Sequence, residues 1–102
     1  MKINWSDIAE ADLDDIFGYI ARDVPYYADQ FIDKLIESTD RLLTHPRIGR
    51  CVPEADNRDD LRELIVHGYR IIYFLQSEQQ LQILTVIHGS RDLAGQEKKP
   101  WE

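Results

Sequence analysis

Two segments in the first half of the chain repeat apolar residues at the spacing of an α-helix. The first follows Ser6, which can cap a helix, and its apolar positions are Ala9, Leu13, Ile16, Phe17 and Ile20. The second starts after Pro25, keeps a helical period from Ala28 to Leu43, and is ended by Pro46. We expect two amphipathic helices in an antiparallel hairpin. Most of the acids in the first segment fall outside its apolar stripe and are expected to be solvated: Asp12, Asp14, Asp15 and Asp23.

Four other segments have the pattern of β-strands. Residues 1–5 predict a short first strand, with Ile3 and Trp5 on one face. Residues 61–66, 69–76 and 81–88 predict three more strands, joined by the short links "HG" and "SEQQ" in two hairpins. The last two strands are apolar on both faces, which is typical of central strands.

The remaining segments predict no regular structure. Residues 45–60, "HPRIGRCVPEADNRDD", hold two prolines, a glycine and many polar residues, and we expect a loop. Residues 89–102 are polar, and we expect a flexible tail in which Trp101 can dock on the protein. The order β-α-α-β-β-β predicts a single α+β domain over residues 1–102, with a small, mostly antiparallel sheet and the helical hairpin packed on one face.

The charge of the chain is distributed unevenly. The formal net charge is −7, and residues 1–60 contain 14 acidic and 7 basic side chains, whereas residues 61–102 contain five of each. Strong direct binding of nucleic acid is therefore not expected, because phosphate binding needs a basic face. Cys51 is the single cysteine, and no apolar run is long enough to cross a membrane. These features favour a cytoplasmic protein with no membrane contact.

The "HG" link fixes how the two strands beside it pair. If it is a two-residue hairpin loop, Val66 faces Tyr69 and Ile65 faces Arg70. Glu63 then lies diagonal to Arg70 on the same sheet face, within reach of its side chain. We expect a structural Glu63–Arg70 ion pair. Exchanging the two residues should recover part of the stability that Glu63→Ala loses.

The chain resembles the RelE/ParE toxins of type II toxin–antitoxin modules, and most closely the ParE-like branch, often labelled plasmid stabilisation proteins. The segments that carry the resemblance lie along nearly the whole chain: "DLDDIFGYIARDVP", "ADQFIDKL", "HPRIGRCVPE", "RELIVHGYRIIY" and "VIHGSRDL". The resemblance implies a small sheet wrapped by a helical hairpin and a cognate, ParD-like antitoxin. It also implies one of two activities: RelE-like members cut mRNA on the ribosome, and ParE-like members act on DNA gyrase.

The residues favour the gyrase-directed alternative. A ribonuclease of this family would use Arg70 and Arg91, and His88 could transfer a proton near Arg91. The family's lysine positions fall on Leu61 and Glu63, and its tail tyrosine falls on Glu97. The carboxylates of Glu63 and Glu97 would repel a scissile phosphate. A non-toxic, complex-forming relative remains a third alternative. The expected target-binding residues lie between Arg62 and Trp101: Arg62, Tyr73, His88, Arg91 and Trp101.

No cofactor or metal is expected. The three histidines and Cys51 show no spacing typical of a zinc site. The acidic charge of residues 1–60 and the apolar helix stripes predict an antitoxin arm that brings basic residues to this half.

Overall fold

The computed structural model describes all 102 residues and has the expected α+β fold. The order is β1 (Lys2–Trp5), α1 (Asp7–Ala21), α2 (Pro25–Ser38), the 3₁₀ turn η1 (Asp40–Leu43), β2 (Arg50–Cys51), the 3₁₀ turn η2 (Pro53–Ala55), β3 (Leu61–Val66), β4 (Tyr69–Leu75) and β5 (Gln80–His88). The sheet has five strands in the order β1-β5-β4-β3-β2. β1 runs parallel to β5 and the other pairs are antiparallel. This strand order places β4 and β5 inside the sheet, as their apolar faces predict. Neither helix is long and apolar enough to cross a membrane.

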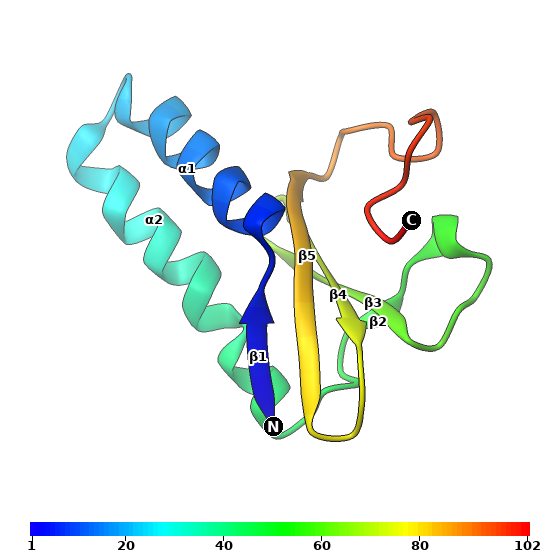
Figure 1. The fold of residues 1–102 in the computed structure, drawn as a ribbon. Coiled ribbons are helices and arrows are strands. Elements are labelled where there is room, and N and C mark those ends of the chain that lie inside the picture. Colours follow the sequence, from blue (N-terminus) through cyan, green and yellow to red (C-terminus); the bar gives the residue numbers. More distant parts are fainter.

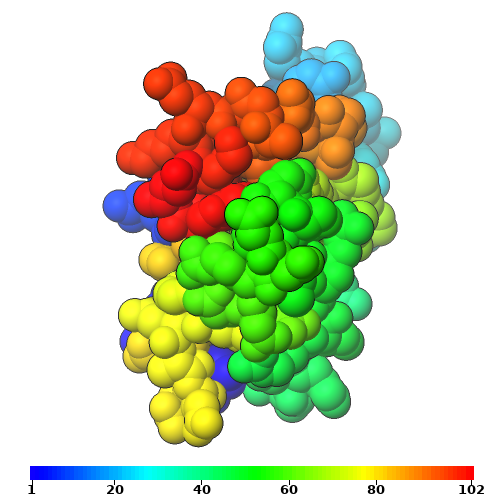
Figure 2. Space-filling model, turned by 90° about the vertical axis from the view of Figure 1, so that its right-hand side faces the viewer, coloured from blue at the N-terminus to red at the C-terminus, as the bar shows by residue number.

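The sheet separates two hydrophobic clusters. The helices lie on one side of it and the tail on the other (Figure 1). α1 and α2 cover one face, where Leu13, Leu35 and Ile71 belong to the larger cluster and Ile3 and Trp5 pack against it. The other face is covered by the segment around η2 and by the tail, residues 89–102, which lie next to each other in Figure 2. This second cluster contains Val52, Ala55, Leu61, Ile72, Ile87 and Leu93, with Trp101 packed against it.

Two predicted boundaries differ from the structure. The second helix ends at Ser38 instead of continuing to Leu43, because the hydroxyls of Ser38 and Thr39 donate to the carbonyl oxygens of Leu35 and Ile36. Such bonds to the preceding turn compete with the α-helical pattern, and the chain continues as the tighter η1. The predicted loop 45–60 contains β2 and η2.

The outer edge of β5 is closed by α1. Ile72 pairs with Thr85 and Tyr73 with Ile83, so Leu84 is an extra residue that forms a bulge. Beyond the bulge, the Val86 N–H and the Thr85 hydroxyl both donate to Asp12 Oδ2, the first over 2.9 Å. Asp12 was expected to be solvated, but it satisfies the part of this edge that the short β1 does not reach.

Candidate functional site: a neutralised arginine on the sheet

A tight turn brings the central charged residues together. His67 and Gly68 both have positive φ, 49° and 84°, as a type I′ hairpin turn requires. The resulting register pairs Val66 with Tyr69 and Ile65 with Arg70, as predicted. Glu63 and Arg70 therefore point from neighbouring strands to the face of the sheet that the tail covers.

Arg70 is bound by two carboxylates. Its Nε donates to Glu63 Oε1 over 2.6 Å, and its Nη1 and Nη2 donate to the two carboxylate oxygens of Glu54 over 2.9 and 2.7 Å. The other oxygen of Glu63 accepts from Arg50 Nε over 2.5 Å. We call these four residues the Arg70 network. Two arginines and two glutamates make it neutral overall.

Two side chains of the Arg70 network are buried, and the other two are partly exposed to solvent. The side chains of Glu63 and Arg70 are 0% and 7% exposed, whereas those of Glu54 and Arg50 are 21% and 59% exposed. A depression of about 390 Å³ above it is lined by Arg50, Glu54, Ile65 and Arg70, among other residues. Solvent therefore reaches the two partners at the rim but hardly reaches Arg70.

Hydrogen bonding keeps Glu54 and Arg70 in their charged forms. The side-chain hydrogen bond from Arg70 lowers the pKa of Glu54, although partial burial opposes the shift. The bond to Glu54 likewise raises the pKa of Arg70 against the effect of burial, and the bond to Glu63 adds to it. Arg70 is thus a permanent cation whose charge is already used, and it is not free to hold a phosphate.

Glu54 reaches Arg70 because the segment before it is anchored in the second cluster. Val52 is fully buried, and its N–H donates to the Leu61 carbonyl oxygen over 3.1 Å. Ala55 is also buried, so the intervening η2 holds Glu54 over the sheet. Sequence reasoning missed Glu54, since it lies in a segment with no apolar period. The signal available was a short "VPEA" with apolar residues on both sides of the carboxylate.

Two of the five predicted target-binding residues make hydrogen bonds within the chain. Tyr73 is fully buried, and its hydroxyl donates to the Pro46 carbonyl oxygen and accepts from the Gly49 N–H. Arg62 donates to the carbonyl oxygens of Arg47, Gly49 and Asp59 and pairs with the Asp59 carboxylate. Both side chains hold the segment before β2 against the sheet, and their assignment to target binding stays a prediction.

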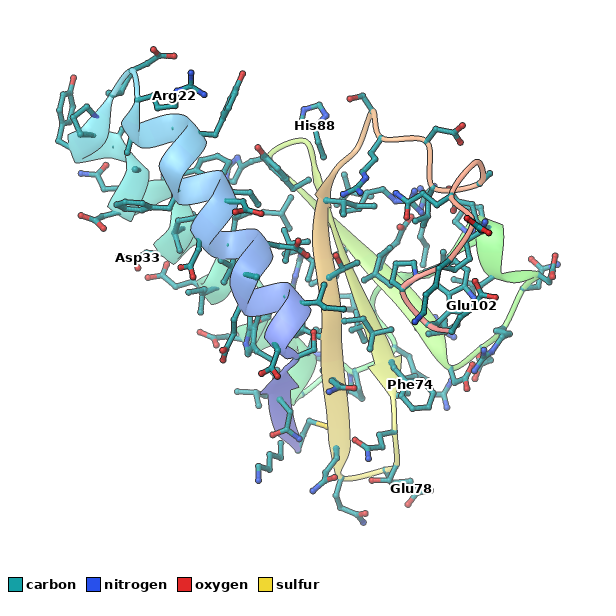
Figure 3. All side chains as sticks on the ribbon, turned by 45° about the horizontal axis from the view of Figure 1, so that its top comes forward. Arg22, Asp33, Phe74, Glu78, His88 and Glu102 are labelled. Atoms are coloured by element: carbon teal, nitrogen blue, oxygen red, sulfur yellow. The ribbon has the colours of Figure 1, made fainter.

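The other three predicted residues lie where β5 ends and in the tail. His88 and Arg91 are exposed, and Figure 3 shows the His88 ring beyond the end of β5. Neither forms a salt bridge, and His88 Nδ1 shares a hydrogen bond with the Ser90 hydroxyl over 2.6 Å. Trp101 is half-buried and lines a depression with Phe74 and Glu102 on the second face of the sheet.

The positions compared with the family's nuclease residues are poorly placed for RNA chemistry. Leu61 and Glu63 are both buried in the sheet, and Glu97 is an exposed carboxylate in the tail. The structure therefore brings together Arg70 and Glu63, adds Glu54 and Arg50, and leaves His88 and Arg91 outside the Arg70 network.

Comparison with known proteins was made for the sequence and for the fold. The sequence model of the family described as "ParE toxin of type II toxin-antitoxin system, parDE" matches residues 3–93. A solved chain from the chromosomal ParDE TA system of P. aeruginosa has a similar fold, with a TM-score of 0.73 and 20% sequence identity. That alignment covers 86% of this chain and 95% of the other. No curated protein matches the sequence significantly.

Proposed function

Because the chain belongs to the ParE family of toxins from type II toxin–antitoxin systems, we propose that it inhibits DNA gyrase and is neutralised by a cognate antitoxin. The observation that carries the choice of target is the Arg70 network. Arg70 is the arginine that a family ribonuclease would use to hold RNA. As a whole residue it is 6% exposed, and it is neutralised by Glu54 and Glu63. The proposal implies a cytoplasmic protein, in agreement with a single free cysteine, Cys51.

The Arg70 network argues against a ribonuclease on chemical grounds. Cleavage of RNA by its own 2′-hydroxyl needs a base, a cation for the phosphate and an acid for the leaving oxygen. A buried carboxylate at Glu63 and an apolar Leu61 supply none of these groups to a bound strand. Since Arg70 is neutralised and Leu61 and Glu63 stand at the family's two lysine positions, the proposed mode of action is binding to a large enzyme that the toxin arrests.

The proposed contact region for gyrase is the exposed end of β5 with the tail. His88 and Arg91 are free of ion pairs there, and Trp101 adds a half-buried ring. Residues 61–102 have five acidic and five basic side chains, so this region does not repel a protein that is itself bound to DNA. α1 and α2 lie on the opposite side of the sheet from the tail (Figure 1).

The test is supercoiling of relaxed plasmid by purified gyrase with and without the purified chain. We expect supercoiling to be lost and linear DNA to appear after protein digestion. Arg91→Ala should raise the concentration for half-inhibition about tenfold, equivalent to about 1.4 kcal/mol of binding. Arg22→Ala is the matched control, because Arg22 is also an exposed arginine but lies at the end of α1.

Normal supercoiling at excess chain would overturn the proposed target. If ribosome-bound mRNA is cut instead, the RelE-like activity is the function. If neither gyrase nor mRNA responds and cells that express the chain alone grow normally, the chain is a non-toxic relative that acts only in complexes.

A further inference from the structure

A row of aromatic rings ends at an open depression between the helices and the sheet. Tyr27 packs on Phe31 and Phe31 on Tyr69, with ring centroids 6.0 and 5.7 Å apart. Tyr69 then meets the His88 ring edge-on at 5.3 Å. Beyond this contact, Tyr19, Tyr69 and His88 line a depression of about 450 Å³, which we call the aromatic depression.

The first 40 residues, which include the α1 side of the aromatic depression, are acidic overall, and Arg22 is the cation nearest to Tyr19 along the chain. Residues 1–40 contain ten acidic and three basic side chains, and none of these acids forms a salt bridge, since all ion pairs lie between Arg47 and Arg70. Asp15 lies four residues before Tyr19, which places it one turn away on the same face of α1. Tyr19 is also in the last turn of α1, where the helix dipole is negative.

The rings of the aromatic depression present the kind of surface that attracts cations. The face of an aromatic ring is negative, and a guanidinium or ammonium group within about 6 Å of its centre is stabilised. The chain already contains such a contact in the same row of rings, where Lys34 Nζ lies 5.8 Å from the Tyr27 centroid. Tyr19 is 69% exposed, so its ring is open to a partner.

We infer that the aromatic depression is the binding site, or seat, for an arginine side chain of the neutralising antitoxin. The inference rests on the proposed function, because it names the chemistry of the partner that the family implies. Arginine fits better than lysine, since its planar group stacks on a ring and is less strongly hydrated. The bound arginine stacks on Tyr19 at the rim, with Tyr69 and His88 as the walls and Asp15 one helical turn from Tyr19 on the same face of α1.

The test measures the affinity of the purified cognate antitoxin for the chain and for three variants. Tyr19→Leu keeps apolar bulk but removes the ring, and it should weaken binding about 3- to 30-fold. Tyr19→Phe keeps the ring and should bind within about twofold of the unchanged chain. Tyr26→Leu is the control, because Tyr26 is 80% exposed on α2 and does not line the aromatic depression.

A second measurement identifies which arginine of the antitoxin occupies the aromatic depression. Each arginine of the antitoxin is changed to glutamine in turn and combined with Tyr19→Leu. One of these changes should weaken binding in the unchanged chain and have little further effect beside Tyr19→Leu. Asp15→Asn should also weaken binding and reduce its dependence on salt.

The outcomes separate the inference from the proposed function. Antitoxin that binds all Tyr19 variants equally, or that loses as much affinity with Tyr26→Leu, overturns the arginine seat alone. A chain that binds no cognate antitoxin overturns the proposed neutralisation and the seat together.

Discussion

Replacing Glu63 with alanine should lower the free energy of unfolding by about 2–3 kcal/mol. Its side chain is 0% exposed, so the change leaves the Arg70 Nε–H without an acceptor where water does not enter freely. The lost Cγ methylene contributes about 0.8 kcal/mol of this cost. Arg50 contributes little, because its side chain is 59% exposed and water can replace the carboxylate.

Glu54 limits the loss of stability in Glu63→Ala, so the effects of changing the two glutamates on the free energy of unfolding depend on each other. In Glu63→Ala, Arg70 keeps the two hydrogen bonds to Glu54. In Glu54→Ala it keeps Glu63, and water can reach the freed Nη groups, so we expect a loss of about 1–2 kcal/mol. In the double variant a buried guanidinium has no carboxylate, and the loss should exceed the sum of the single losses by about 1 kcal/mol or more.

The Arg70 network also changes the expectation for a charge exchange. The sequence predicted recovery after exchanging Glu63 and Arg70, because it showed neither Glu54 nor Arg50 as a further partner. In the structure, Glu63→Arg combined with Arg70→Glu would place a carboxylate beside Glu54 and a guanidinium beside Arg50. Like charges at both contacts should prevent any recovery, and the exchange should be at least as unstable as Glu63→Ala.

The measurement is urea unfolding at pH 7, followed by circular dichroism and compared at equal m-values. Glu78→Ala is the control, since Glu78 is exposed in the β4–β5 turn and should shift stability by less than about 0.5 kcal/mol. Single losses that simply add, or a Glu63→Ala protein as stable as the control, would refute the reasoning.

Three further predictions concern pH and local packing. Arg70 holds the pKa of Glu54 below its ordinary value near 4.5, so Glu54 stabilises the fold above that pH. This contribution should be lost as the pH falls through the lowered pKa, and Glu54→Gln should flatten this part of a stability–pH curve. Asp12→Ala leaves a strand-edge N–H unpaired and should cost about 1–3 kcal/mol in urea unfolding, with Asp14→Ala near zero. Gly49→Ala should unfold at clearly lower urea than the unchanged chain, because its Cβ would lie 2.6 Å from a backbone carbonyl oxygen and a tyrosine hydroxyl. An unchanged midpoint would contradict it.

The sequence was sufficient to predict two helices, four of the five strands and the residue pairing of one hairpin. A two-residue "HG" turn permits a single pairing, which placed Ile65 opposite Arg70 correctly. The family match over residues 3–93 confirms the resemblance to ParE toxins. Gyrase as the target remains a prediction, because fold and family do not identify which groups contact it.

The features that the sequence did not predict have physical reasons. β2 has two residues, Arg50 and Cys51, which is too short to show a period. Glu54 and Asp12 make contacts far along the chain, with Arg70 and Val86, and such partners depend on how the elements pack. Local patterns describe which face of an element is apolar, but they do not show which polar side chain will close a sheet edge.

The position of β5 has a consequence for synthesis of the protein on the ribosome. β5 is the last strand to be made, yet it joins β1 to β4, and β1 has no other neighbour in the sheet. The second cluster needs Leu93 and Trp101, close to the last residue. A nascent chain can therefore form its acidic helical hairpin early, while the sheet must wait until β5 has left the ribosomal exit tunnel. Antitoxin that is already present at that moment meets the helices before the sheet, with its exposed end of β5, has formed.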